Sequence, residues 1–389
     1  MENSVKISPK FKYLSFGLMA IGVIALIVGF LINPQRTWAN YLLNSYYFLT
    51  LAIGASFFLA IQYITQSGWS AMFKRVPEAI GSFVPVGVIL LSFVLVFGAH
   101  SLYHWSHTEA VEGDPLLAHK APYLNLPFMI IRYLIFVGLW VFMILLLRKY
   151  SLLEDKHGGV EYFKKSEYYS KVFIFILGFS FTLGTIDWIM SINAHWFSTL
   201  FSLKNFASAF YHGSAAIILV VIILNHYGYF PLLSKYHLHD FSKYIFMLSI
   251  IYGYLWYAQY MLIWYANIPE ETVYYTRIIQ EGWKTPFLLD IIINWAFPFL
   301  FLMLNAIAKN KKALLFTTSL LLIGHWIDLY LQIMPGTTGV NSIGFIEIGT
   351  YLGFMGIFAF MVSRTLSKAP IIPENHPFLE ESLAHKLHH

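Results

Sequence analysis

Residues 13–32 read YLSFGLMAIGVIALIVGFLI, a run of twenty residues without a charged side chain. An α-helix needs about 20 mostly apolar residues to cross the hydrocarbon core of a bilayer, and similar runs recur along the chain. Of the 389 residues, 58% are apolar and 12% are charged, against about half and about a quarter in soluble domains. The composition excludes an ordinary soluble domain and indicates an integral membrane protein.

Apolar runs bounded by Lys, Arg, Pro, Asn and aromatic residues predict ten membrane spans. Backbone groups in lipid must form hydrogen bonds within their own segment, and the runs do not alternate strictly, so we expect helices rather than barrel strands. The predicted fold is one all-α integral membrane domain over residues 1–389, with a tail at about 362–389. The predicted spans are residues 13–32, 41–63, 79–98, 128–147, 172–192, 206–224, 245–265, 286–308, 313–331 and 342–361.

The basic residues are distributed unequally between the two sides of these spans. Of the 25 Lys and Arg residues, 19 fall on the side of the two termini, five fall in the opposite loops, and Arg132 lies within a span. The positive-inside rule then predicts a multi-pass protein of the cytoplasmic (inner) membrane with both termini in the cytoplasm. The same distribution accounts for the basic pI without nucleic acid as a partner.

Seven ionisable side chains fall within the predicted spans, where an unpaired charge is costly and a functional role is the first hypothesis. At about 1.5 Å per residue, each lies roughly 5 to 10 Å below the predicted outer surface, and the inner half has no charged residue at comparable depth. They are Arg132, Asp187, His212, Asp290, His325, Asp328 and Glu347.

This one-sided distribution predicts a shared hydrated pocket that opens outward. Four carboxyl groups face one arginine, so full ionisation would leave uncompensated negative charge in a low-dielectric region. We expect the acids to exchange protons, the two histidines to relay them, and Arg132 to supply the counter-charge. His325 and Asp328 are three residues apart and share a helix face.

Two other interpretations of these residues stay open. Arg132 and an aspartate can form a buried structural pair, with the histidines bonded to backbone or hydroxyl groups. His212 and His325 lie at similar depth and can alternatively clamp a b-type haem. The sequence contains no cysteine, which excludes cysteine-ligated iron–sulfur clusters and covalent c-type haem within this chain; we expect it to hold no metal and no redox cofactor.

Two short strings suggest an internal repeat. Residues 184–188 read GTIDW and residues 324–328 read GHWID, each near the outer end of an outward-running span. Four spans separate them, which hints at a duplicated four-helix unit over about 41–192 and 206–331.

The same regions resemble a known family. The strings DWIMSI (187–192), HWFSTL (195–200) and HWIDLY (325–330), followed by MPG (334–336), resemble NrfD-like membrane subunits of alternative complex III, a quinol:cytochrome c oxidoreductase. Ten spans with short tails are most similar to the shorter of the two such subunits in that complex. The positions that match the family's motifs are Asp187, His325 and Asp328.

The resemblance implies two four-helix bundles, spans two to five and six to nine, flanked by spans one and ten. It also implies partners: other membrane subunits, subunits with haem c and iron–sulfur clusters on the periplasmic side, a terminal oxidase, and lipids. Menaquinol or another quinone would be bound in the complex. The expected function is that of a membrane subunit supporting quinol oxidation and releasing protons through the acid and histidine residues. The alternatives are a scaffold for assembly and a secondary transporter.

Overall fold

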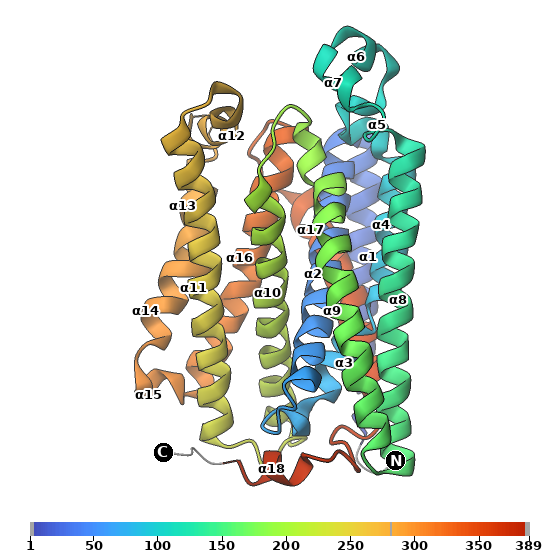
Figure 1. Cartoon of the computed structure of the whole chain (residues 1–389), viewed down its shortest axis with the longest axis vertical. Coiled ribbons are helices and arrows are strands. Elements are labelled where there is room, and N and C mark those ends of the chain that lie inside the picture. Colours follow the sequence, from blue (N-terminus) through green and yellow to red (C-terminus); the bar gives the residue numbers. More distant parts are fainter. Residues whose placement is uncertain (1–3, 281, 386–389) are drawn as a thin grey trace.

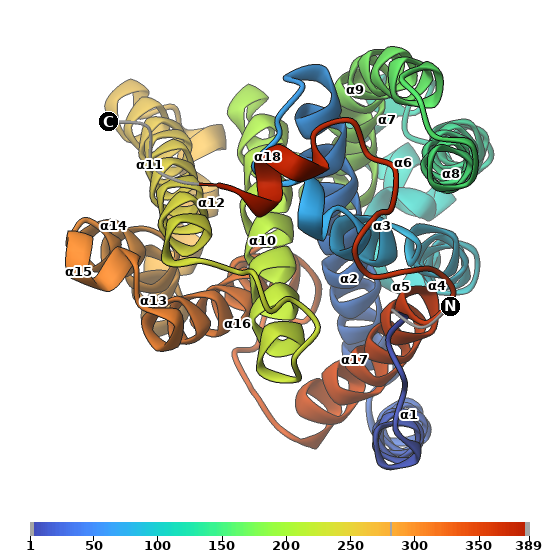
Figure 2. The same ribbon diagram turned by 90° about the horizontal axis from the view of Figure 1, so that it is seen from below.

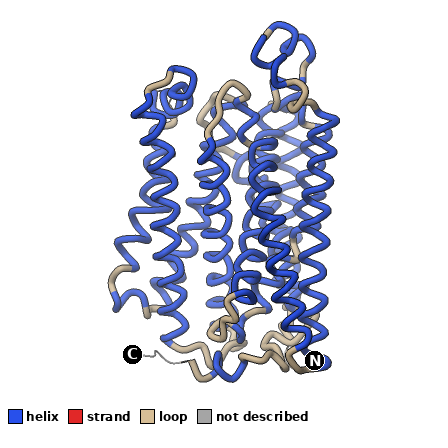
Figure 3. Tube along the Cα trace, in the orientation of Figure 1, coloured by secondary structure: helices blue, strands red, loops and turns tan. Residues whose placement is uncertain are grey.

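The chain folds into long, roughly parallel helices in the computed structural model, which describes residues 4–280 and 282–385 (Figures 1 and 3). Every regular element in these ranges is a helix, and ten helical segments are long and apolar enough to cross a membrane. The predicted all-α fold with ten membrane-length apolar helices is therefore confirmed for the described residues. The ten segments are α1 (Pro9–Ile32), α2 (Pro34–Ile64), α3 with α4 (Arg75–Gly81 and Val84–Phe97), α8 (Leu126–His157), α9 (Glu161–Trp188), α10 (Thr199–His226), α11 (Lys235–Ala266), α13 to α14 (Lys284–Leu302), α16 (Lys311–Thr337) and α17 (Phe345–Leu366).

The short helices lie at the two ends of this array. Both ends of the described chain lie at the lower end in Figure 1, and the opposite, upper end carries α6, α7 and α12. After α17 the tail runs across the lower face to α18 and on toward α11 (Figure 2). The short helices are η1 (Ala71–Phe73), α5 (Ala99–Leu102), η2 (His104–Ser106), α6 (Thr108–Gly113), α7 (Pro115–Lys120), η3 (Met190–Asn193), α12 (Pro269–Gln280), α15 (Asn305–Ala308) and α18 (Leu379–Leu383).

Capping residues and prolines define the starts of several long helices. Ser8 and Asn33 accept hydrogen bonds from the backbone N–H groups of Phe11 and Arg36, and a proline follows each cap. Such caps satisfy N–H groups that have no partner within the helix, and proline at the first position loses nothing because its N–H would be unpaired there. Local sequence thus fixes where α1 and α2 begin.

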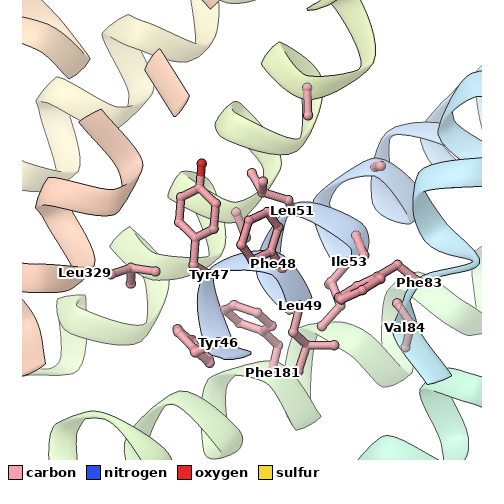
Figure 4. Close-up of a cluster of buried hydrophobic side chains, with 14 of the residues drawn as sticks. Tyr46, Tyr47, Phe48, Leu49, Leu51, Ile53, Phe83, Val84, Phe181 and Leu329 are labelled. Atoms are coloured by element: carbon pink, nitrogen blue, oxygen red, sulfur yellow. The ribbon is translucent and has the colours of Figure 1, made fainter. Parts of the chain in front are cut away.

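Helix α2 is the centre of the fold. Its most apolar window is 83% buried, against 22% for α1 and for α13 to α14, although α1 is the more apolar helix. It contacts α4, α9, α10, α16 and α17. Figure 4 shows its side chains Tyr46, Tyr47 and Phe48 among Phe83, Phe181 and Leu329 from other helices.

Glycines allow α2 and α10 to touch backbone to backbone. A Cβ atom added at Gly54 would lie 1.8 Å from the carbonyl oxygen of Ala209, and one at Gly213 would lie 2.6 Å from the Gly54 carbonyl carbon. Helices in membranes commonly associate through such small residues. The close approach brings the polar face of α10 against α2 and α16.

The eighth span is not a regular helix. Helix α13 (Lys284–Ile291) passes into a π-helical turn, η4 (Ile292–Ala296), before α14 (Phe297–Leu302). Pro298 has no N–H to offer to the carbonyl of Asn294, and its ring would clash with that carbonyl in an α-helix. The turn widens instead, with the Phe297 N–H bonded to the Ile292 carbonyl five residues back. The π-turn directs the buried Asn294 side chain toward α10, where it bonds to His212.

Candidate functional site

The main polar network is centred on an ion pair between α10 and α16. Lys204 Nζ pairs with Asp328 Oδ1, and their side chains are only 7% and 2% exposed. Asp328 also accepts hydrogen bonds from Gln332 Nε2 at 2.9 Å and from Ser208 Oγ at 3.2 Å. An ion pair at this depth is favourable only when further hydrogen bonds satisfy its remaining groups, and here they do so for both carboxylate oxygens.

Two histidines stack beside this ion pair. The rings of His212 and His325 lie 4.3 Å apart between centroids with an interplanar angle of 15°, and both side chains are buried. His325 Nε2 lies 2.9 Å from Thr50 Oγ1 of α2, whose hydroxyl already donates to the Tyr47 carbonyl. Nε2 of His325 therefore carries hydrogen and donates to Thr50. Two stacked imidazolium rings would repel each other, so this pair can hold one added proton but not two.

A linear chain of three side chains joins α10 to the π-turn and α13. His212 Nδ1 lies 2.8 Å from the Ser208 carbonyl oxygen, which can only accept, so Nδ1 carries hydrogen. His212 Nε2 lies 3.0 Å from Asn294 Oδ1, and Asn294 Nδ2 donates to Asp290 Oδ1 at 2.7 Å. Asp290 also accepts from Tyr252 Oη at 2.9 Å and from Trp256 Nε1 at 3.1 Å.

This chain has two self-consistent hydrogen-bond states. With the amide oriented as observed, a doubly protonated His212 donates to Asn294 Oδ1, and Asn294 donates to an ionised Asp290. With the amide turned over, a neutral His212 accepts from Asn294 Nδ2, and a protonated Asp290 donates to Asn294 Oδ1. Transfer of one proton between His212 and Asp290 therefore requires the Asn294 side-chain amide to turn over.

The remaining predicted site residues form two separate ion pairs. Arg132 binds Asp187 in a bidentate manner, Nε to Oδ2 at 2.7 Å and Nη2 to Oδ1 at 3.1 Å, and its guanidinium packs on the Tyr123 ring. Arg36 binds Glu347 in the same way, with both contacts at 2.7 Å. Bidentate arginine–carboxylate pairs are strong and geometrically fixed. Arg132 thus pairs with an acid, as predicted, but Asp187 and Glu347 bind different arginines and do not share one site.

The prediction that all seven residues share a single pocket is wrong. Hydrogen bonds and ion pairs divide the seven residues into three groups: Arg132 with Asp187; Glu347 with Arg36; and the remaining four in one network. The physical reason is that each of the first two acids lies on a helix face that meets its own arginine. The four residues of the central network are His212, Asp290, His325 and Asp328.

Sequence reasoning missed the cations of two of these acids. Lys204 and Arg36 were assigned to outer loops because the predicted spans began at 206 and 41, whereas α10 begins at Thr199 and α2 at Pro34. Three of the four acids consequently have a basic partner. The prediction that four acids face a single arginine is therefore wrong. The available signal was the four-residue spacing of Lys204 from Ser208. Residues four apart share a helix face, so this spacing would have placed Lys204 in the helix.

Buried charge also occurs at the lower end, contrary to the expected asymmetry. Glu78 of α3 accepts from Arg75 Nη1 at 2.7 Å and from Arg148 Nη1 at 2.8 Å, and Lys74 pairs with Glu154 at 2.6 Å. Hydropathy placed the start of the third span at residue 79, but α3 begins at Arg75 and buries this charged turn against α8. The tail packs nearby, where burial lowers the pKa of His376 to about 3.

The histidine geometry does not suit haem. The two rings stack face to face, and their Nε2 atoms are bonded to Thr50 and Asn294 in place of pointing at a common central position. Axial haem ligation requires both nitrogens to point at one iron from opposite sides. Among the described residues, no group of three or more His, Cys, Asp or Glu side chains is placed to hold a metal ion.

Comparison with known proteins adds no family to this description: no protein-family model matches the sequence, and a search of curated proteins finds no match. Fold and site together define a class, a polytopic helical protein with membrane-length helices and a buried acid–histidine–lysine network.

Proposed function

We propose that this chain is an integral membrane subunit of a quinol:cytochrome c oxidoreductase of the alternative complex III type, and that its central network handles protons released by quinol oxidation. The resemblance of residues 187–200 and 325–336 to NrfD-like subunits is the basis for the complex. The observation that carries the proton role is the row of hydrogen bonds from His212 through Asn294 to Asp290. This row can hold a single proton, either on His212 or on Asp290.

In this proposal the roles within the predicted site differ. Asp290 and His212 exchange the proton, and His325 and Asp328 beside Lys204 set the charge around them. The Arg132–Asp187 and Arg36–Glu347 pairs are fully bonded and hold helices together, so we assign their acids a smaller part in exchange. General acid and base groups of this kind typically contribute a factor of about 100 or more to rate.

The proposal also covers the orientation of the protein in the membrane, its partner subunits and the grouping of its helices. The upper end faces the periplasm and meets haem c and iron–sulfur subunits, both termini lie in the cytoplasm, and menaquinol is bound in the complex. Helices α2 to α9 and α10 to α16 form the two four-helix bundles, with α1 and α17 beside them. Contacts of α4 with α8, α8 with α9, α10 with α11 and α13 with α16 lie within these groups, and the close contact of α2 with α10 joins the two groups.

The test uses Asn294→Leu in the assembled complex. Leucine keeps the size of the side chain but removes the amide between His212 and Asp290, so quinol:cytochrome c turnover and proton release should fall at least tenfold. Asn44→Leu is the matched control. Asn44 is equally buried, but it bonds to Trp326 and to the Asn40 carbonyl and takes no part in the hydrogen bonds between His212 and Asp290. Unchanged turnover in Asn294→Leu would refute the proton role.

A scaffold is the second candidate function, and the two bidentate ion pairs favour it. Substitution of Asp187 or Glu347 would then reduce the yield of intact complex while turnover per intact complex stays normal. Co-purification of the chain with haem-containing partners, measured by mass spectrometry and optical spectra, tests membership of the complex independently of either role.

A further inference from the structure

A small cavity of about 30 Å³, with room for a group the size of one or two water molecules, lies beside the central network, between α10, α11, α12, α13 and α16. Its apolar wall consists mainly of aromatic rings, those of Phe201, Trp256, Tyr274, Tyr275 and Phe287. Its polar lining consists of Lys204, Gln259, Asp290, Asp328 and Gln332. A concave, largely aromatic space with a few converging polar groups is the usual form of a small-molecule site.

The polar lining offers acceptors without partners. Gln332 is 3% exposed, and its Oε1 has no hydrogen-bond partner, because the amide nitrogen is the atom that bonds to Asp328. Gln259 is 4% exposed and makes no hydrogen bond among the described residues. A buried acceptor without a partner, such as Gln332 Oε1, costs about 1–3 kcal/mol, so a donor from a ligand would stabilise this site.

The charge of the lining is also unbalanced. Lys204 is committed to Asp328, whereas Asp290 accepts only from the neutral donors of Tyr252, Trp256 and Asn294. With both acids ionised, the lining carries one excess negative charge. These three bonds leave one of the carboxylate's roughly four acceptor positions free.

We propose that this cavity binds a primary ammonium group. An ammonium group has three N–H donors and no acceptor, which matches Gln332 Oε1, the Gln259 amide oxygen and the free position on Asp290. Its charge balances that of Asp290, and aromatic rings attract ammonium ions through their negative faces. The inference does not depend on the proposed function.

The ammonium group can belong to a lipid headgroup or to a soluble amine, and the surroundings favour the lipid. A second hollow of about 230 Å³ lies between α11 and α12 and shares the Tyr275 side chain with the cavity. Trp264 and Ile279 in its wall are 61% and 40% exposed. Asn267 and Thr276 also line it, and their side chains can donate to a phosphate ester. Phosphatidylethanolamine combines all these features.

The experiment measures lipids retained by the purified full-length chain. The chain is incorporated into phosphatidylglycerol nanodiscs that contain a minor fraction of phosphatidylethanolamine or of phosphatidylcholine, and native mass spectrometry counts the bound lipids. We expect one phosphatidylethanolamine to be retained in preference to phosphatidylcholine, whose quaternary nitrogen has no N–H. Equal retention of the two lipids would overturn the proposal.

Variants identify the cavity as the place of binding. Asp290→Asn should weaken retention about tenfold or more, since a hydrogen bond to a charged group is lost, and Glu270→Gln, the same charge change on exposed α12, should not. Gln259→Glu adds an anion to the lining at a side chain whose replacement breaks no hydrogen bond, and it should strengthen retention, which a misfolded protein cannot imitate. Unaltered retention in both cavity variants would refute the site.

Free ethanolamine distinguishes the two sources of the ammonium group. If ethanolamine displaces the lipid from the wild-type chain, the ammonium group is what the cavity recognises, and the lipid tails add only affinity. If ethanolamine does not compete at any concentration that leaves the chain folded, while the cavity variants behave as expected, the lipid is the ligand.

Discussion

Removal of the positive charge at Lys204 should be among the most damaging single changes in this protein. In Lys204→Met the methionine fills the space of the lysine stem, but the Asp328 carboxylate, 2% exposed, loses its ion-pair partner. Ser208 and Gln332 remain as neutral donors. Breaking a buried pair by removing one partner costs about 3–5 kcal/mol, which is a large part of the total stability of most domains.

The Arg36–Glu347 pair provides a matched comparison within the same molecule. Arg36 is 26% exposed, and Glu347 keeps hydrogen bonds from Asn40 Nδ2 and the Gly344 N–H when the arginine is lost. Water can solvate the freed carboxylate in part, so Arg36→Met should cost less, about 1–3 kcal/mol.

The assay is unfolding of the purified chain in mixed micelles with increasing denaturing detergent, followed by tryptophan fluorescence, for Lys204→Met, Asp328→Asn and the double variant. The double variant should be more stable than the sum of the single effects predicts, by about 1–3 kcal/mol, because it leaves no unpaired buried charge. Additive single effects, or a cost for Lys204→Met below that of Arg36→Met, would show that the pair is not the buried, coupled unit described above.

Three further changes test other parts of the structure. The pKa of His376 is lowered by burial to about 3, so folding favours the neutral ring; stability is complete above the ordinary pKa of about 6.5 and is lost as pH falls below it, by about 2 kcal/mol at about pH 5. Hydrogen exchange of the tail should therefore accelerate in acid, and His376→Asn should remove this dependence; identical acid responses would contradict it. Pro298→Ala restores an N–H donor to the eighth span, so the π-turn should relax and turn Asn294 away from His212; turnover per assembled complex should fall while helix content is unchanged, and normal turnover would count against the role of the turn. Gly54→Ala should destabilise the α2–α10 contact by about 3 kcal/mol or more, because the new Cβ would lie 1.8 Å from a backbone oxygen; Gly138→Ala, with nothing within 4 Å, is the control in the same unfolding assay.

Sequence alone determined the class of the fold. Ten long apolar runs require helices because lipid offers no hydrogen-bond partner to the backbone, and the structure has ten such helices in its described residues. Sequence also located seven ionisable side chains that the structure buries, since any charge within an apolar run stands out. The irregular turn at Pro298 was visible as a proline inside a predicted span, although its π-helical form was not.

Tertiary structure alone decided which charges meet. Hydropathy measures where a helix becomes polar and not where it ends, so Lys204 and Arg36 were taken for loop residues although they lie in the first two turns of buried helices. Whether acids share one site depends on helix rotation and on close contacts such as Gly54 with Gly213. These depend on packing between segments far apart in the chain, and for that reason the single predicted pocket became one network and two ion pairs.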